Sequence, residues 1–200
     1  EIYEELVEMI KGNMITQKIG DPNNFDTDIG PIITKQSIEK LNKYIDKCRE
    51  QNFDVFQTTK NTDDMHISPT LITINKISDI KNEQFGPILH LLKYKSNNTD
   101  KLINDINKTG YGLTMGIHSR IESRADYFGK QSNIGNIYIN RDMVGAVVGS
   151  QPFGGVGLSG SGFKAGGPNY LLQFLNEKVI SKNSVAFGGN TELLNLQEDL

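Results

Sequence analysis

Residues 140–169 combine repeated glycines with small and apolar side chains, a composition suited to binding a ligand through the backbone. Repeated glycine costs too much backbone entropy for this stretch to be a helix. A flexible linker is also disfavoured, because Val147, Val148 and Phe153 would gain free energy from burial. The stretch is therefore predicted to be an ordered loop whose backbone N–H groups can approach a ligand closely.

The only thiol of the chain, Cys48, is the one side chain that could act as a thiolate nucleophile. It falls at helical spacing with Ile38, Leu41 and Ile45 in a helix expected over residues 35–51. Burial among apolar side chains raises the pKa of a thiol and makes it unreactive. Cys48 is therefore predicted to be a structural core residue.

Two further patterns resemble a cofactor-binding or metal-binding motif, and neither is expected to function as one. Residues 155–160 (GVGLSG) match a dinucleotide fingerprint, but more glycines and Lys164 follow them, where the fingerprint needs a helix and a later acidic residue. The histidines His66, His90 and His118 lack the spacing of metal ligands, so no metal site is predicted.

The elements that must position these residues follow from hydrophobic periodicity, which predicts strands alternating with helices. This order indicates an α/β fold with a mainly parallel sheet and flanking helices. A capping box at Ser119 and Glu122 is expected to start the fourth helix. Helices are expected at the start of the chain and over residues 35–51, 98–108 and from 119; strands are expected over residues 14–19, 53–57, 71–74, 87–94, 111–118 and 134–139, with a separate late strand over 177–186.

Composition narrows the class of protein. With 200 residues the chain can bury a substantial core, and a net charge of −3 offers no electrostatic footprint for nucleic acid. No apolar run approaches the roughly 18 residues of a membrane span. A single cysteine excludes an internal disulfide and fits a reducing compartment, so a cytoplasmic location is expected. The chain starts inside an uncapped helical pattern, so we expect it to lack a preceding part.

Several motifs occur together in a recognisable order: residues 83–87 (EQFGP), 114–119 (TMGIHS), 135–141 (GNIYINR), the glycine-rich stretch, and 186–194 (AFGGNTELL). In this combination the chain resembles the aldehyde dehydrogenase superfamily, most closely its 1-pyrroline-5-carboxylate (L-glutamate 5-semialdehyde) dehydrogenase branch of proline-utilisation proteins. The resemblance covers nearly all of the chain. It implies a partial catalytic domain over residues 1–175, incomplete on its N-terminal side, and a C-terminal oligomerisation strand and tail over 176–200.

The resemblance implies roles for five residues. Glu83 would accept hydrogen bonds from the nicotinamide ribose of NAD, a task that suits an acceptor-only carboxylate, and Phe85 would flank the nicotinamide ring. Without its motif, Glu83 would be read as a solvated residue before a strand. Gly145 and Ala146 would present consecutive N–H groups to the α-carboxylate of the substrate. Phe153 either packs on the aliphatic part of the substrate or anchors the loop, and both readings stay open.

The family reaction begins with attack of a thiolate on the aldehyde, followed by hydride transfer to NAD and hydrolysis of the thioester. The resemblance places the nucleophile and the general-base glutamate upstream of this chain, so no catalytic residue is assigned here. We expect part of an NAD-dependent L-glutamate 5-semialdehyde dehydrogenase of proline catabolism, inactive alone and forming a homodimer. Two alternatives stay open: a non-catalytic remnant or assembly module of a split or decayed gene, and a half that complements a separately encoded N-terminal half.

Overall fold

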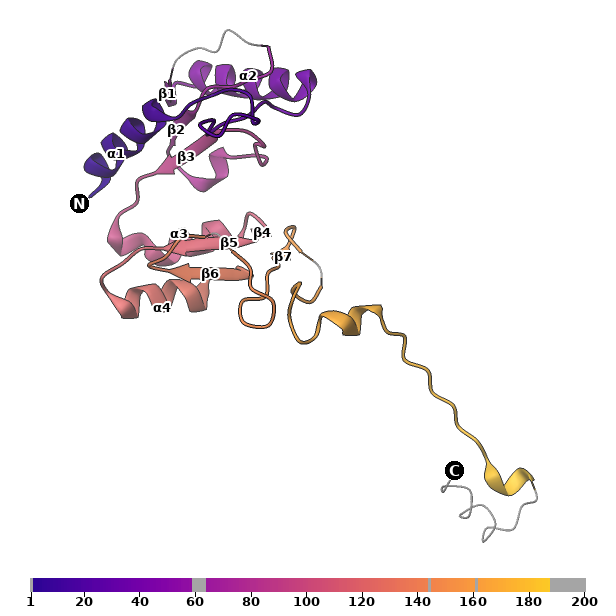
Figure 1. The fold of residues 1–200 in the computed structure, drawn as a ribbon. Helices are drawn as coiled ribbons and strands as arrows, with labels where there is room; N and C mark the ends of the chain where they lie inside the picture. Colours follow the sequence, from indigo (N-terminus) through magenta and orange to yellow (C-terminus); the bar gives the residue numbers. More distant parts are fainter. Residues whose placement is uncertain (1, 59–63, 144, 161, 188–200) are drawn as a thin grey trace. The chain divides into compact units, whose positions relative to one another are not determined.

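The computed structural model describes residues 2–58, 64–143, 145–160 and 162–187 (Figure 1). The chain divides into two compact units. Unit 1 comprises Glu1–Met143 and Gly155–Ser161, and unit 2 comprises Val144–Gly154 and Gly162–Leu200. Each unit is described by itself.

Unit 1 holds the α-helices and strands of the described part of the chain, which together form a mixed α/β fold of the expected class. The helices are α1 (Tyr3–Thr16), α2 (Lys35–Glu50), α3 (Thr99–Asn107) and α4 (Glu122–Gln131), with short 3-10 helices η1 (Ile77–Asp79) and η2 (Ser96–Asn98). The strands are β1 (Asp54–Gln57), β2 (Thr70–Ile74), β3 (Ile88–Leu92), β4 (Tyr111–Gly112), β5 (Thr114–Ile117), β6 (Asn136–Ile139) and β7 (Val156–Gly157).

Helix α2 covers the sheet β1–β2–β3 (Figure 1) and supplies much of its core. The helix starts at Thr34, whose hydroxyl oxygen accepts a hydrogen bond from the Ser37 N–H at 3.1 Å. Its predicted apolar stripe is confirmed, because all four members are buried: Ile38, Leu41, Ile45 and Cys48. In the sheet, β1 runs antiparallel to β2, and β2 runs parallel to β3.

A second, parallel pair of strands, β5 and β6, is connected through α4, which lies beside β6 (Figure 1). Ala125 and Phe128 of α4 are buried, as predicted. The short strands β4 and β7 pair antiparallel. Gly112 of β4 is required there, because an added Cβ would lie 2.5 Å from the Asn133 carbonyl oxygen. The stretch expected as one strand over residues 111–118 is thus divided between two sheets.

Two local predictions are wrong. The strand expected over residues 14–19 does not form, because α1 continues to Thr16; beyond it, only one isolated bridge joins Ile19 to Ile29. The capping box at Ser119 is also absent. The Ser119 hydroxyl instead accepts from the Ile121 N–H and donates to the Ile121 carbonyl, and α4 begins only at Glu122. Side-chain turns of this kind compete with helix capping.

Unit 2 contains two 3-10 helices, η3 (Tyr170–Phe174) and η4 (Ser184–Phe187). The late strand expected over residues 177–186 is not formed in the described chain: residues 176–183 belong to no strand ladder, and η4 occupies the end of the range. A strand needs a hydrogen-bonding partner, and the described part of this chain offers it none. Most of the expected tail motif, residues 188–194, lies outside the described residues.

Candidate functional site

The segment that carries Glu83 and Phe85 is a tight loop leading into β3. Its backbone is fixed at the end: the Ile88 N–H donates to the Gly86 carbonyl at 2.7 Å, and the Thr70 N–H of β2 donates to the Pro87 carbonyl at 2.9 Å. Gly86 packs closely on α2, since an added Cβ would lie 2.7 Å from Cδ1 of buried Leu41 and would force that side chain to shift. The loop is therefore seated on α2 and β2.

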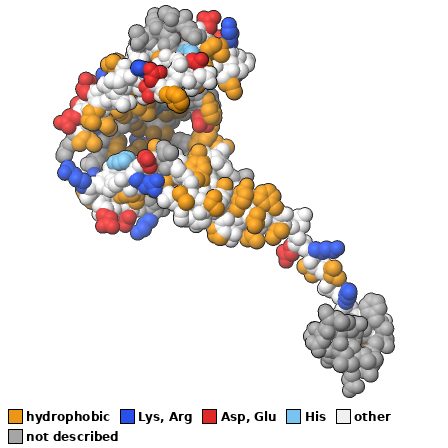
Figure 2. All heavy atoms as spheres, viewed as in Figure 1, with side chains coloured by type: hydrophobic (Ala, Val, Ile, Leu, Met, Phe, Trp, Pro, Cys, Tyr) orange, Lys and Arg blue, Asp and Glu red, His pale blue; other side chains and the backbone are white. Residues whose placement is uncertain are grey.

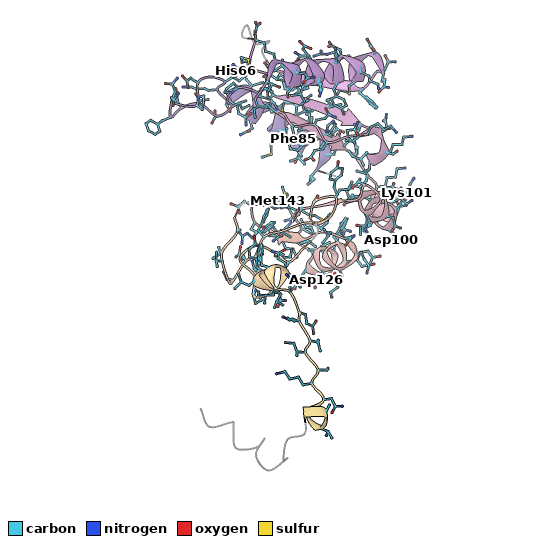
Figure 3. The ribbon with its side chains drawn as sticks, turned by 90° about the vertical axis from the view of Figure 1, so that its right-hand side faces the viewer. His66, Phe85, Asp100, Lys101, Asp126 and Met143 are labelled. Atoms are coloured by element: carbon cyan, nitrogen blue, oxygen red, sulfur yellow. The ribbon has the colours of Figure 1, made fainter. Side chains whose placement is uncertain are left out.

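Glu83 and Phe85 are exposed on this seated loop. The Phe85 ring is 79% exposed, although a large aromatic side chain gains free energy from burial (Figure 3). The Glu83 side chain is also exposed, and its carboxylate forms no ion pair with any residue that the structure describes. An acceptor-only group and an apolar ring, two residues apart on a fixed backbone, can bind a ligand that offers hydroxyl groups beside a flat ring.

Gly145 and Ala146 lie in unit 2 and are exposed. Gly145 has φ of +112°, a conformation that residues with a side chain rarely adopt. A Cβ at Gly145 would meet nothing within 4 Å, so the glycine is required for its backbone angle and not for space. The open surroundings suit a backbone approached by a ligand.

A hairpin follows Ala146 and fixes the next part of the loop. Val147 and Gln151 exchange two hydrogen bonds, with Gln151 N donating to Val147 O at 2.7 Å and the reverse bond at 2.9 Å. The expectation that valine side chains anchor this loop is wrong, because Val147 is 51% and Val148 86% exposed. Backbone hydrogen bonds hold the hairpin instead.

Residues 164–167, here called the brace, hold the hairpin from its other side. The Gly149 N–H at the hairpin tip donates to the Gly166 carbonyl at 2.8 Å. Phe153 and Ala165 exchange two hydrogen bonds, of 3.0 and 2.9 Å. The Lys164 ammonium donates to the Gly154 carbonyl at 2.7 Å. The brace was missed from the sequence, because backbone pairing of two glycine-rich segments leaves no periodic pattern.

Phe153 is half-buried and tied to the brace through its backbone. This arrangement leaves both sequence interpretations of its side chain standing. Of the five predicted residues, Glu83 and Phe85 occur together in unit 1, whereas Gly145, Ala146 and Phe153 occur together in unit 2.

Cys48 is buried, with 3% of its surface exposed, as its place on the α2 stripe predicted. A group that sequence reasoning missed lies beside it. The Tyr44 hydroxyl is 2.6 Å from Nε2 of His90 on β3, and the two rings meet edge to face. Burial, with a hydrogen bond to Cys48 as the next cause, raises the pKa of Tyr44, and burial lowers the pKa of His90. Neutral groups therefore join α2 to β3 here.

Within the described ranges, no three His, Cys, Asp or Glu side chains come together in a way that could hold a metal ion. A search of the same residues finds no helix with the length and apolar character needed to cross a membrane.

The class of protein follows from the sequence profile of the aldehyde dehydrogenase family, which matches residues 1–180. The chain belongs to this family.

Particular relatives give a finer comparison. The chain is 40% identical over 195 residues to the bifunctional protein PutA of Klebsiella aerogenes, covering 94% of this chain and 15% of PutA. It is 35% identical to the 1-pyrroline-5-carboxylate dehydrogenase of Staphylococcus aureus, covering 91% of this chain and 35% of the relative. The chain thus spans about a third or less of the length of these relatives.

Solved structures agree with these relatives. A crystal structure of the bifunctional proline utilization A protein matches 94% of this chain and 19% of its own, with a TM-score of 0.83 and 38% identity. A variant of the Thermus thermophilus 1-pyrroline-5-carboxylate dehydrogenase matches 87% of this chain and 34% of its own, with a TM-score of 0.75 and 30% identity.

Proposed function

We propose that this chain is part of an NAD-dependent L-glutamate 5-semialdehyde (1-pyrroline-5-carboxylate) dehydrogenase, which oxidises the aldehyde to L-glutamate in proline catabolism in the cytoplasm. Relatives with the printed names PutA and 1-pyrroline-5-carboxylate dehydrogenase support this choice within the family. The observation that carries the proposal is that Glu83, Phe85, Gly145 and Ala146 stay exposed beside backbone that hydrogen bonds hold, at residues 86–88 in unit 1 and 147–151 in unit 2.

Glu83 and Phe85 are proposed to bind the nicotinamide end of the cofactor. The exposed Glu83 carboxylate fits a pair of ribose hydroxyls, because it can accept from both, and the exposed Phe85 ring fits one face of a flat heterocycle. NAD supplies the acceptor for the hydride that leaves the substrate. The amides of Gly145 and Ala146 are proposed to bind the α-carboxylate, with the half-buried Phe153 beside the aliphatic part.

The chain by itself is proposed to be inactive. Its only thiol, Cys48, is buried in the core of unit 1 and has the hydroxyl of Tyr44 for a neighbour. The chain spans about a third or less of its relatives' length, and it is proposed to bind NAD weakly because Glu83 and Phe85 would contact the nicotinamide end alone. The alternatives of a non-catalytic remnant and of a half that needs a separate N-terminal half share this inactivity, so complementation separates them.

The test is a fusion of this chain behind the unmatched upstream part of the Staphylococcus aureus relative, compared with the chain alone. NAD reduction with L-glutamate 5-semialdehyde should occur in the fusion and be absent from the chain. In the fusion, Glu83→Gln should raise the KM for NAD about tenfold, because one partner of a charged hydrogen bond is lost, and Glu122→Gln on exposed α4 is the matched control. A folded fusion that binds NAD but oxidises no aldehyde contradicts the proposal, as does turnover by the chain alone.

A second proposal concerns self-association through η3 and the segment that follows it. Large apolar side chains gather there (Figure 2): Leu171, Leu172, Phe174, Leu175, Val179 and Ile180 are 53–79% exposed. Exposed apolar surface on an unpaired, extended backbone favours pairing with another chain, and a symmetric dimer is the commonest result. Light scattering should give a dimeric mass, and Val179→Asp with Ile180→Asp should give a monomer. A monomeric wild-type chain at high concentration would contradict this.

A further inference from the structure

The hydrogen bonds described above join the brace to the candidate substrate loop. Among them, the bond of Lys164 is the one made by a side chain. Its Nζ lies 2.7 Å from the Gly154 carbonyl oxygen, and both residues are half-buried. A hydrogen bond from an ammonium group is stronger than one between neutral groups, and partial burial reduces its competition with water. The contact lies next to Phe153, where the loop leaves its backbone bridge to Ala165.

The packing around Gly154 shows that the Lys164 side chain lies directly across the loop. An added Cβ at Gly154 would be 3.3 Å from Cα and 3.4 Å from Cγ of Lys164, closer than side chains usually approach. Because Gly154 has no side chain, the aliphatic stem of Lys164 can pass beside it, and the ammonium group can reach the Gly154 carbonyl. The stem and the ammonium together restrain the backbone on the C-terminal side of Phe153.

We propose that Lys164 is a positioning residue that sets the substrate preference of the glycine-rich loop. By closing the brace at Gly154, it keeps Phe153 and the hairpin of residues 147–151 in one conformation, and so fixes the end of the segment that presents Gly145 and Ala146. The effect on substrate rests on the proposed function. The effect on loop order does not, because it concerns only contacts within unit 2.

Hydrogen exchange of the chain tests the positioning directly. In Lys164→Met, which keeps the apolar stem and removes the ammonium, the amides of Phe153 and Ala165 should exchange about tenfold faster, because loss of a charged hydrogen bond shifts a local opening equilibrium by about that factor. Lys164→Arg should restore slow exchange. Amides of β6 in unit 1 serve as the internal reference, and Lys130→Met on exposed α4 is the matched control. Equal exchange in Lys164→Met and wild type overturns the proposal.

Kinetics in the fusion with the Staphylococcus aureus upstream part test the substrate preference. Lys164→Met should raise the KM for L-glutamate 5-semialdehyde about tenfold while kcat and the KM for propanal, which has no carboxylate, change less than about twofold. Lys164→Arg should restore the low KM. Equal losses for both aldehydes, or a loss confined to kcat, overturn the assigned role. If the wild-type fusion is inactive, the proposed function has failed, and hydrogen exchange still decides whether Lys164 positions the loop.

Discussion

Unit 1 and the glycine-rich loop of unit 2 are held by different kinds of contact. In unit 1 the sheet β1–β2–β3 and helix α2 enclose side chains such as Ile45, Leu71 and Ile72, which are at most 2% exposed. In unit 2 the hairpin and the brace are joined mainly by backbone hydrogen bonds, while Val147 and Val148 face solvent. Side-chain identity therefore dominates the stability of unit 1, whereas backbone conformation dominates the order of the loop.

The largest effect should come from Ile45→Ala in the core of unit 1. Truncating a buried isoleucine removes apolar contacts and leaves a cavity, which costs about 3 kcal/mol of unfolding free energy. Urea denaturation should show this loss, and Lys47→Ala on the exposed side of α2 is the matched control. If hydrogen exchange in the hairpin of unit 2 accelerated as much as exchange in β2, the claim that the two units are held by different contacts would be wrong.

Gly145→Ala should loosen the glycine-rich loop without creating any steric clash. Since φ at Gly145 is +112°, alanine would be strained there by about 1–2 kcal/mol, although no atom lies within 4 Å of its Cβ. The expected results are faster exchange of the Val147 amide and an unchanged urea midpoint for unit 1. An ordered loop with wild-type exchange in this variant would show that the backbone angle is not what holds it.

Gly12→Ala sharpens the same comparison, because Gly12 is also open within 4 Å but lies inside α1. Alanine in a helix interior loses less backbone entropy on folding than glycine does, so the substitution should stabilise unit 1 by about 0.5–1 kcal/mol. Thermal denaturation would measure the gain. Two open glycines would then respond with opposite signs, and a destabilised Gly12→Ala would contradict this account.

The smallest expected effect is a pH dependence from His90. Burial lowers the pKa of His90 in the folded chain below its ordinary value of 6.5, so the unfolded chain binds more protons in that window. The contribution of His90 to the unfolding free energy should therefore be fully present above pH 6.5 and should fall as the pH drops toward the lowered pKa. Urea midpoints at pH 7.5 and 5.5 test this. His90→Gln should flatten the dependence, and His118→Gln, at an exposed position, should leave it unchanged.

The sequence predicted the elements whose order depends on local periodicity. The helix over residues 35–51 and its buried stripe ending at Cys48 were correct to within one residue, because side chains three and four apart must share a face. The loop that carries Glu83 was singled out only because of the motif at residues 83–87. That Gly86 rests on Leu41 could not be read from spacing, since the contact joins positions far apart in the chain.

Predictions failed where a competing local turn, or a partner elsewhere, decides the structure. Ser119 was expected to cap a helix, but its hydroxyl satisfies the Ile121 backbone first. The late strand over residues 177–186 requires a partner that the described chain does not provide. The brace of residues 164–167 joins the hairpin mainly through the backbone N–H and C=O groups of Ala165 and Gly166, and almost every residue carries such groups, so side-chain patterns gave no signal for it.

The packing of the loop of residues 83–87 on α2 links two positions that would otherwise vary independently. A Cβ at residue 86 would lie 2.7 Å from Cδ1 of Leu41, so the Leu41 side chain would have to shift to admit it. A change at either position therefore restricts what the other can accept, and Gly86→Ala should be tolerated better in a Leu41→Val background than alone. During divergence these two sites are expected to change as a pair, so that an inherited substitution in the core restricts which residues this loop can accept.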